Sequence, residues 1–234
     1  VQSRQIGVMD MESSLKNYLA SKGKSGQAPY LGLIHRLDQP VEGILCFART
    51  PAAAASLSSQ LTDGTMRKYY LAVTTAVPAH AQGTLTDYLL KDGRKNLSAV
   101  ADPTIKGAKK SVLSYQVLAA QDSRALLEIQ LKTGRHHQIR VQMAYHGTPL
   151  YGDMKYGVPV GTAKLDKKEN ADQGTMTAAG NRNMPGIRTA GNMGSGRESI
   201  ALCASSLIFF HPVTKKEMTF EIEPVGGAFQ LFQV

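Results

Sequence analysis

Residues 30–50, YLGLIHRLDQPVEGILCFART, decide how the first part of this chain folds. Two short apolar runs, LGLI and GILCFA, flank the polar segment HRLDQPVE, and this pattern is typical of two strands joined by a loop. Thr50 and Pro51 follow, which are residue types favoured at the N-cap and at the first position of a helix. The stretch therefore predicts a strand, a loop and a strand, and then an Ala-rich helix that ends at Gly64.

Most of the other patterned segments indicate strands. Runs rich in β-branched and aromatic residues predict strands at residues 66–75, 111–120 and 125–133, and two more around the HPVTKK turn within residues 207–224. Apolar residues at helical spacing predict helices at residues 8–21 and 136–147. Many strands and few helices favour an α+β fold built on a mainly antiparallel sheet.

Length and composition suit one domain with a sizeable core, since 42% of the 234 residues are hydrophobic. No apolar run approaches the length of a membrane span, so a soluble protein is expected. Cys46 and Cys203 lie in apolar surroundings and fit a reducing cytoplasm, although the sequence leaves open whether they pair. The chain begins abruptly with VQSRQ, which indicates that N-terminal residues are missing.

The charge of the chain suits a polyanionic partner. The 27 Lys and Arg residues against 18 Asp and Glu residues give a net charge of +9, which is typical of nucleic-acid-binding proteins but also of basic enzymes with scattered lysines. From Gly157 to Ile208 there is no aromatic residue, and residues 161–198 are rich in Gly, Asn, Met, Lys and Arg. This composition predicts a flexible insertion whose basic side chains could contact an anion.

Asp38 is the first residue that could carry chemistry. It lies among apolar neighbours next to a turn, so it is either a structural turn aspartate or a carboxylate at a strand end that acts as nucleophile or base. A catalytic carboxylate needs a cation that keeps it ionised. The segment TGRHHQIR offers Arg135 and Arg140 at the start of a predicted helix, where phosphate binding and a surface ion pair are the alternatives.

Two further motifs give weaker indications. Tyr69 and Tyr70 point to opposite faces of a predicted strand, so one of them could stack on a nucleobase, with simple packing as the alternative. His136 and His137 are adjacent and do not share a helix face, so no metal site is expected. The sequence contains no GxGxxG, P-loop or GxSxG motif, so hydride transfer, P-loop phosphoryl transfer and serine hydrolysis lack support.

The order and spacing of four segments are more specific than any single one. HRLDQPVEGILCFART, RKYYLAV, LKTGRHHQIRVQMAYHGTPLYGDMKYG and LIFFHPVTKKEMTFEIEP together resemble the RluA-type pseudouridine synthases over residues 31–157 and 200–224. The resemblance implies the pseudouridine synthase fold, which is a mixed, mainly antiparallel sheet with flanking helices and a central cleft, as one catalytic domain over residues 1–234. It also implies an enzyme that isomerises uridines in ribosomal or transfer RNA and needs neither cofactor nor metal. We expect the chain to be a monomer, although the sequence itself leaves the oligomeric state open.

The resemblance also assigns roles to single residues. Asp38 matches the catalytic aspartate, Tyr70 the tyrosine of the K-x-Y-x-A strand, and Arg140 the arginine expected to pair with Asp38, with Arg135 as the second choice. Arg36 matches the arginine that, in this family, fills the gap left in the RNA by the flipped nucleotide. The residues expected to contact RNA are His35, Arg36, Lys68, Arg135 and His137.

The chain departs from the family pattern at two places in these motifs. DQPVEG replaces the commoner DKDTSG, which alters only the loop after the aspartate, and His136 replaces the usual threonine, which could change contacts to the base. Two rival functions are a catalytically silent RNA-binding protein on the same scaffold and a glycosidase-like hydrolase. Binding alone does not need Asp38, and a hydrolase usually needs a second carboxylate, for which Glu42 is the nearest candidate in sequence.

Overall fold

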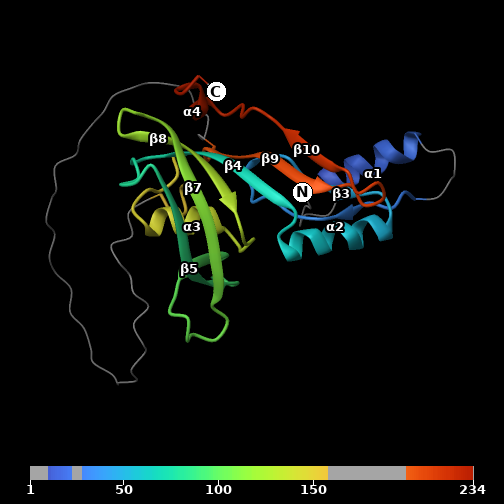
Figure 1. Ribbon diagram of the computed structural model, residues 1–234, viewed down its shortest axis with the longest axis horizontal. Helices are drawn as coiled ribbons and strands as arrows, with labels where there is room; N and C mark the ends of the chain where they lie inside the picture. Colours follow the sequence, from blue (N-terminus) through green and yellow to red (C-terminus); the bar gives the residue numbers. More distant parts are fainter. Residues whose placement is uncertain (1–9, 23–27, 158–198, 234) are drawn as a thin grey trace, which may run out of the picture.

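The computed structural model describes residues 10–22, 28–157 and 199–233, and its centre is an eight-stranded sheet (Figure 1). The insertion predicted at residues 161–198 lies outside the described residues. The strands of the sheet are β2 (Glu42–Gly43), β4 (Arg67–Thr74), β5 (Gln82–Asp92), β6 (Leu97–Val100), β7 (Lys109–Gln121), β8 (Arg124–Leu131), β9 (Leu202–Phe210) and β10 (Glu217–Glu221).

The main path through the sheet runs in the order β10-β9-β4-β8-β7-β5-β6, and every neighbouring pair on it is antiparallel. The short β2 pairs with β9 in parallel, so the sheet is mixed but mainly antiparallel. The predicted fold class is therefore confirmed. The strand that carries both tyrosines, β4, lies between β8 and β9 in the middle of the sheet.

Apart from β2, the strands within residues 30–50 belong to a smaller unit. Strands β1 (Gly32–Leu33) and β3 (Phe47–Ala48) pair antiparallel, and helix α2 (Pro51–Asp63) follows them. The hydroxyl of Thr50 accepts a hydrogen bond from the Ala53 amide at 3.1 Å, and Gly64 ends the helix in a left-handed conformation with φ 83°. The caps predicted for this helix are both confirmed.

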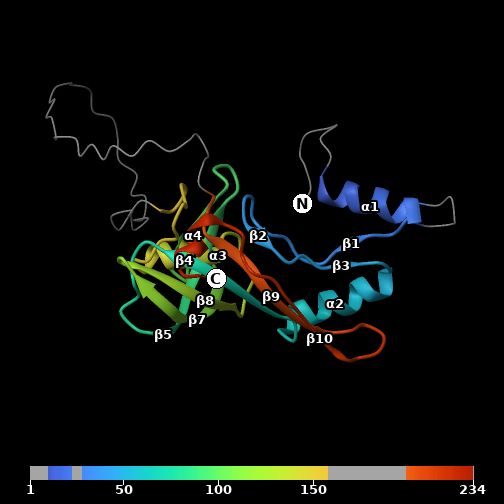
Figure 2. The ribbon, with the colours of Figure 1, turned by 90° about the horizontal axis from the view of Figure 1, so that it is seen from above.

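The remaining helices differ in how firmly they pack. Helix α1 (Met11–Lys22) buries no residue, whereas α3 (Gln138–Tyr145) buries six consecutive residues, among them Ile139 and Met143, which pack against the large sheet. The short α4 (Gly227–Gln230) buries Phe229. In Figures 1 and 2, α1, α2 and the two-stranded sheet lie to one side, and α3 with β5, β7 and β8 lies to the other. None of the helices within the described residues is both long enough and apolar enough to cross a membrane.

The structure differs from the sequence predictions at several elements. Strands β5 and β6 were not predicted, because β5 has few β-branched side chains and no continuous apolar run. Helix α3 was predicted from residue 136 but begins at Gln138, because His137 before it adopts a left-handed backbone with φ 53°. Cys46 and Cys203 are both buried and free, so the pairing left open by the sequence does not occur.

Candidate active site

A cavity of about 890 Å³ opens where three segments meet. The loop at residues 33–38, strand β4 and residues 130–140 form its walls, so three of the sequence motifs converge on one space. Every residue that the sequence singled out for the site lines this cavity, and these are His35, Arg36, Asp38, Lys68, Tyr70, Arg135, His137 and Arg140.

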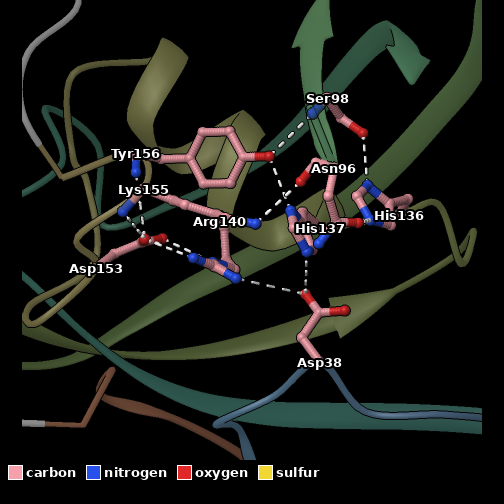
Figure 3. A network of polar contacts seen from close by, with 9 residues as sticks. All are labelled: Asp38, Asn96, Ser98, His136, His137, Arg140, Asp153, Lys155 and Tyr156. Atoms are coloured by element: carbon pink, nitrogen blue, oxygen red, sulfur yellow. Dashed lines mark hydrogen bonds and ion pairs between the residues drawn. The ribbon is translucent and has the colours of Figure 1, made fainter. Parts of the chain in front are cut away.

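The Asp38 side chain faces the cavity with 29% of its surface exposed. Its Oδ2 lies 3.9 Å from Nη1 of Arg140 and 3.8 Å from Nε2 of His137 (Figure 3). Burial raises the pKa of Asp38, and the positive charges of Arg140, Lys155 and Arg36 oppose this rise. Asp38 is thus a partly desolvated carboxylate beside a fixed cation rather than a solvated turn residue.

Arg140 is held in place by a second carboxylate. Its Nε and Nη2 donate to the two oxygens of Asp153 at 2.8 and 2.6 Å, and the backbone amides of Lys155 and Tyr156 also donate to Asp153. Burial alone would lower the pKa of Arg140, but its hydrogen bonds and its attraction to Asp153 and Asp38 raise it. The bidentate pair fixes the guanidinium so that its third nitrogen, Nη1, faces Asp38.

Arg135 lies at the exposed rim of the cavity instead. Its Nε donates to the backbone carbonyl of Lys110 at 3.0 Å. Of the two arginines considered from the sequence, Arg140 is therefore the one that the fold brings to Asp38.

The two tyrosines of β4 separate as predicted for a strand. Tyr70 is 7% exposed and lines the cavity, and its pKa is raised by burial and by the charge of Asp38. Tyr69 does not line the cavity, and its hydroxyl accepts a hydrogen bond from the Gln130 side chain at 3.1 Å. Tyr70 is therefore the tyrosine that a molecule in the cavity would meet.

Burial lowers the pKa of two cationic or titratable residues in the cavity, Lys68 and His35. Burial lowers the pKa of Lys68, and burial together with the charge of Lys68 lowers the pKa of His35 to about 4. Among the described residues, Nε2 of His35 finds no hydrogen-bond partner. His35 is thus a neutral imidazole at neutral pH.

Sequence reasoning missed one side of the site, which Figure 3 shows. The Tyr156 hydroxyl lies 2.8 Å from Nδ1 of His137 and accepts a hydrogen bond from the Ser98 amide at 2.9 Å. The ring of His136 stacks on that of His137, at 3.7 Å between centroids, and contacts the side chains of Ser98 and Asn96. His136 therefore lies in the cavity wall, where the sequence had placed only an unusual ring near the helix start.

Some of the site residues that were missed lie in a recognisable sequence motif, and others do not. Asp153 and Tyr156 belong to GDMKYG, a segment that supported the resemblance but received no site role. Ser98 lies in β6 and Asn96 just before it, in a hairpin that no sequence pattern predicted. Within residues 10–22, 28–157 and 199–233, no group of three or more His, Cys, Asp or Glu side chains could hold a metal ion.

Comparisons with known proteins identify the family of this chain. The family model described as RNA pseudouridylate synthase matches residues 4–145. The uncharacterized RNA pseudouridine synthase YlyB of Bacillus subtilis is 37% identical over 126 residues, which are 54% of this chain and 41% of that protein. An uncharacterized RNA pseudouridine synthase of Zymomonas mobilis is 37% identical over 153 residues, which are 64% of this chain and 68% of that protein.

Solved structures support the same fold. Human RNA pseudouridylate synthase domain containing 4 superposes with a TM-score of 0.67 at 20% identity, covering 93% of this chain and 80% of that one. The related human domain-containing protein 1 gives a TM-score of 0.62 at 20% identity, covering 92% of this chain and 76% of that one. The expected pseudouridine synthase fold is thereby confirmed. Because the family model covers more than half of its length, this chain belongs to the RluA-type RNA pseudouridylate synthase family.

Proposed function

We propose that the chain is an RNA pseudouridine synthase that converts uridine in structured RNA to pseudouridine, with Asp38 acting on the ribose. One observation carries this proposal. The Asp38 carboxylate lies in a cavity beside Tyr70 and faces a guanidinium that Asp153 fixes in place. The chain spans 41% of the Bacillus relative and 68% of the Zymomonas relative, so its activity is inferred from the site and not taken from their names.

The reaction that we propose is an intramolecular rearrangement. The N1–C1′ bond of uridine breaks, the uracil turns, a C5–C1′ bond forms, and the proton lost from C5 is balanced by one gained at N1. Asp38 would act either by attack at C1′ or by removal of the C2′ proton, and both routes require the ionised form. Burial disfavours that form, and the charge of Arg140 opposes the effect of burial.

The cavity suits a single extruded nucleotide. Its volume of about 890 Å³ lies within the range of small-molecule sites, roughly 300–1,000 Å³. Enzymes that act on a base usually take it out of its stack and hold it against an aromatic or apolar side chain. We propose that Tyr70 makes this contact with the extruded base. Arg36 is exposed at the edge of the cavity, and we propose that its side chain fills the space that the extruded nucleotide leaves in the RNA.

RNA is the partner that the charges favour. The cavity carries seven cationic side chains and the carboxylate of Asp38, and the cations are Arg36, Arg67, Lys68, Lys91, Lys132, Arg135 and Arg140. A further relative, the ribosomal large subunit pseudouridine synthase D of Zymomonas mobilis, is 27% identical over 194 residues, which are 52% of its length. We therefore propose ribosomal RNA as the first substrate to test and transfer RNA as the second.

The setting that we propose is the cytoplasm, with the chain acting as a monomer. The two buried free thiols suit a reducing compartment. All the side chains assigned to the reaction come from one chain, so a single copy suffices for the site.

The test uses RNA labelled with tritium at C5 of uridine, because forming the C5–C1′ bond releases that hydrogen to water. Ribosomal RNA transcribed in vitro is incubated with the wild-type chain and with Asp38→Asn, and the product is mapped for pseudouridine. We expect the wild type to release tritium, and Asp38→Asn to release none while it binds the RNA with nearly unchanged affinity.

A matched control is Asp122→Asn, which makes the same change in the exposed turn between β7 and β8 and should leave tritium release unchanged. Tritium release by Asp38→Asn at the wild-type rate would refute the assignment. RNA binding by the wild type without release from ribosomal or transfer RNA would favour the silent RNA-binding protein instead.

A further inference from the structure

The ring of His137 lies between Asp38 and Tyr156 and contacts both. It is 7% exposed, its Nδ1 lies 2.8 Å from the Tyr156 hydroxyl, and its Nε2 lies 3.8 Å from Oδ2 of Asp38 (Figure 3). The catalytic role of Asp38 proposed above does not by itself require a histidine at this position. The contacts of His137 nevertheless determine which ring nitrogen carries hydrogen.

The backbone N–H of Ser98 can only donate a hydrogen bond. It donates to the Tyr156 hydroxyl oxygen at 2.9 Å, so the phenol hydrogen must point elsewhere. In the part of the chain that the structure describes, Nδ1 of His137 lies within hydrogen-bond distance of the phenol, and it can accept the phenol hydrogen only if it carries none itself. In a neutral imidazole the hydrogen is then on Nε2, the nitrogen that faces Asp38.

The two other protonation states of His137 fit the surroundings less well. With hydrogen on Nδ1 alone, the phenol hydrogen would lose its acceptor and a lone pair on Nε2 would face the carboxylate. A doubly protonated ring would add a positive charge beside Arg140 and Lys155. Burial, the stacked His136 and these two cations lower the pKa of His137 to about 3, although the charge of Asp153 opposes this.

We propose that His137 is a positioning residue for Asp38, a neutral donor that directs its Nε2–H at the carboxylate in a tautomer fixed by Tyr156 and the Ser98 amide. This inference rests on the proposed function only for its consequence in catalysis. The distance of 3.8 Å is roughly 0.9 Å longer than a normal N–H···O bond, so a small movement of Asp38 would complete it.

The arrangement gives the two carboxylate oxygens different tasks. His137 and Arg140 both face Oδ2, and in Figure 3 the other oxygen of Asp38 points away from both donors. Oδ2 is thus the anchored oxygen, and Oδ1 is the one left to act on the ribose. Because His137 stays neutral near neutral pH, its support for the ionised carboxylate does not vary in the working pH range.

The first test is nuclear magnetic resonance of the full chain with ¹⁵N-labelled histidine, in the absence of RNA. We expect His137 to carry hydrogen on Nε2 and none on Nδ1 at neutral pH. Hydrogen on Nδ1, alone or on both nitrogens, would overturn the proposal whether or not the chain isomerises uridine. Failure of the proposed function and failure of this inference are therefore separate results.

The second test titrates the Asp38 carboxyl carbon by ¹³C resonance in the wild type, Tyr156→Phe and Tyr69→Phe. Without the Tyr156 hydroxyl, the hydrogen of His137 is no longer confined to Nε2. The midpoint of the Asp38 titration should then rise by about half to one pH unit. Tyr69→Phe removes an equivalent hydroxyl outside the cavity and should leave the midpoint unchanged. An unchanged midpoint and an unchanged tautomer in Tyr156→Phe would refute the proposal.

The third test replaces His137 itself. A glutamine amide can donate from nearly the position of Nε2, whereas leucine offers no donor. We expect His137→Gln to keep the Asp38 midpoint close to wild type and to retain part of the isomerisation rate, and His137→Leu to raise the midpoint and lose most of the rate. A purely structural histidine would show no such rescue, so equal effects of the two variants would contradict the positioning role.

Discussion

The guanidinium group of Arg140 interacts with two carboxylates, those of Asp153 and Asp38. Two of its nitrogens are used by Asp153, and the third faces Asp38 at 3.9 Å. The pair with Asp153 is buried and bidentate, so it sets the direction in which the remaining charge points. The distance to Asp38 leaves that carboxylate associated with the cation but still free to move toward a substrate.

This geometry predicts that charge alone cannot replace Arg140. In Arg140→Lys a single ammonium group cannot hold both oxygens of Asp153 and also face Asp38. We expect the rate of tritium release to fall by about 100-fold, because a displaced catalytic group costs roughly that much. Single-turnover kinetics with saturating RNA measures the effect.

Arg135→Lys is the matched control for Arg140→Lys. Arg135 is exposed at the rim, and its guanidinium contacts only a backbone carbonyl among the bonds seen here. The same substitution there should change the rate little. Equal losses in the two variants would mean that the fixed orientation of Arg140 is not what matters.

The buried His35 should make the folded chain less stable as pH decreases. The folded chain lowers the pKa of His35 from 6.5 to about 4, so between these values the unfolded chain binds more protons than the folded one. The contribution of His35 to the free energy of unfolding should therefore fall as pH decreases from about 6.5 to about 4 and level off below. His137, with its pKa lowered to about 3, extends the same trend further.

Urea denaturation at a series of pH values tests this. We expect His35→Gln to make the decline less steep, by up to about 1.4 kcal/mol per pH unit within that window. His80→Gln, at an exposed histidine, should leave the slope as it is in the wild type. A wild-type stability that stays flat from pH 6.5 to 4 would show that His35 is not buried as a neutral ring.

At the scale of elements, local signals predicted the parts that depend on local contacts. The Thr50 cap, the Gly64 end and the alternation of Tyr69 and Tyr70 all follow from residues a few positions apart, and all three were confirmed. Strand β5 was missed because its place is set by pairing with β7, where Leu85 lies opposite Leu113. That partner lies far along the chain, so the residues of β5 alone do not show the pairing.

The same distinction explains what was predicted of the site. Asp38, Tyr70 and Arg140 stand in compact motifs, so the resemblance assigned them before the structure brought them to one cavity. Asp153 binds the Arg140 guanidinium because the chain after α3 returns to that helix. Ser98 contributes to the site through its backbone amide, which donates to Tyr156. A backbone donor is independent of side-chain identity, so no sequence motif could have indicated it.

The short strand β2 links the Asp38 loop to the large sheet. Gly43 pairs with Ala204 of β9 and has φ 134°, a conformation that side chains other than glycine rarely adopt. A Cβ atom at this position would lie 2.5 Å from the Cβ and the backbone nitrogen of Ala204. Glycine is therefore required for β2 to reach β9, and β2 begins four residues after Asp38.

We expect Gly43→Ala to push β2 from β9 and to displace the Asp38 loop. The free energy of unfolding should fall by roughly 1–3 kcal/mol, and tritium release should fall with it even where the chain is still folded. Gly93→Ala is the control, because a Cβ there meets no atom within 4 Å. Wild-type stability and rate in Gly43→Ala would show that β2 does not set the position of Asp38.

At the scale of the whole molecule, the cavity joins parts of the chain that are about a hundred residues apart in sequence. Residues 33–38 form one wall and residues 130–140 another, with β4 between them. Cationic side chains from all three segments surround the single carboxylate of Asp38. The net charge of +9 is thus partly concentrated where a phosphate backbone would have to pass for its nucleotide to enter.

This concentration of charge predicts a steep dependence of RNA binding on salt. Each phosphate contact releases counterions, so the logarithm of the affinity should fall linearly with the logarithm of salt concentration between roughly 50 and 200 mM. Removing one contact should reduce the slope by about 0.7 to 0.9. We expect that reduction for Arg36→Gln and for Lys91→Gln, which line the cavity, and no reduction for Lys216→Gln, which is exposed and does not line it. Fluorescence anisotropy with labelled RNA measures the slopes. A wild-type affinity independent of salt, or an equal reduction in all three variants, would mean that the RNA does not follow the cationic rim of the cavity.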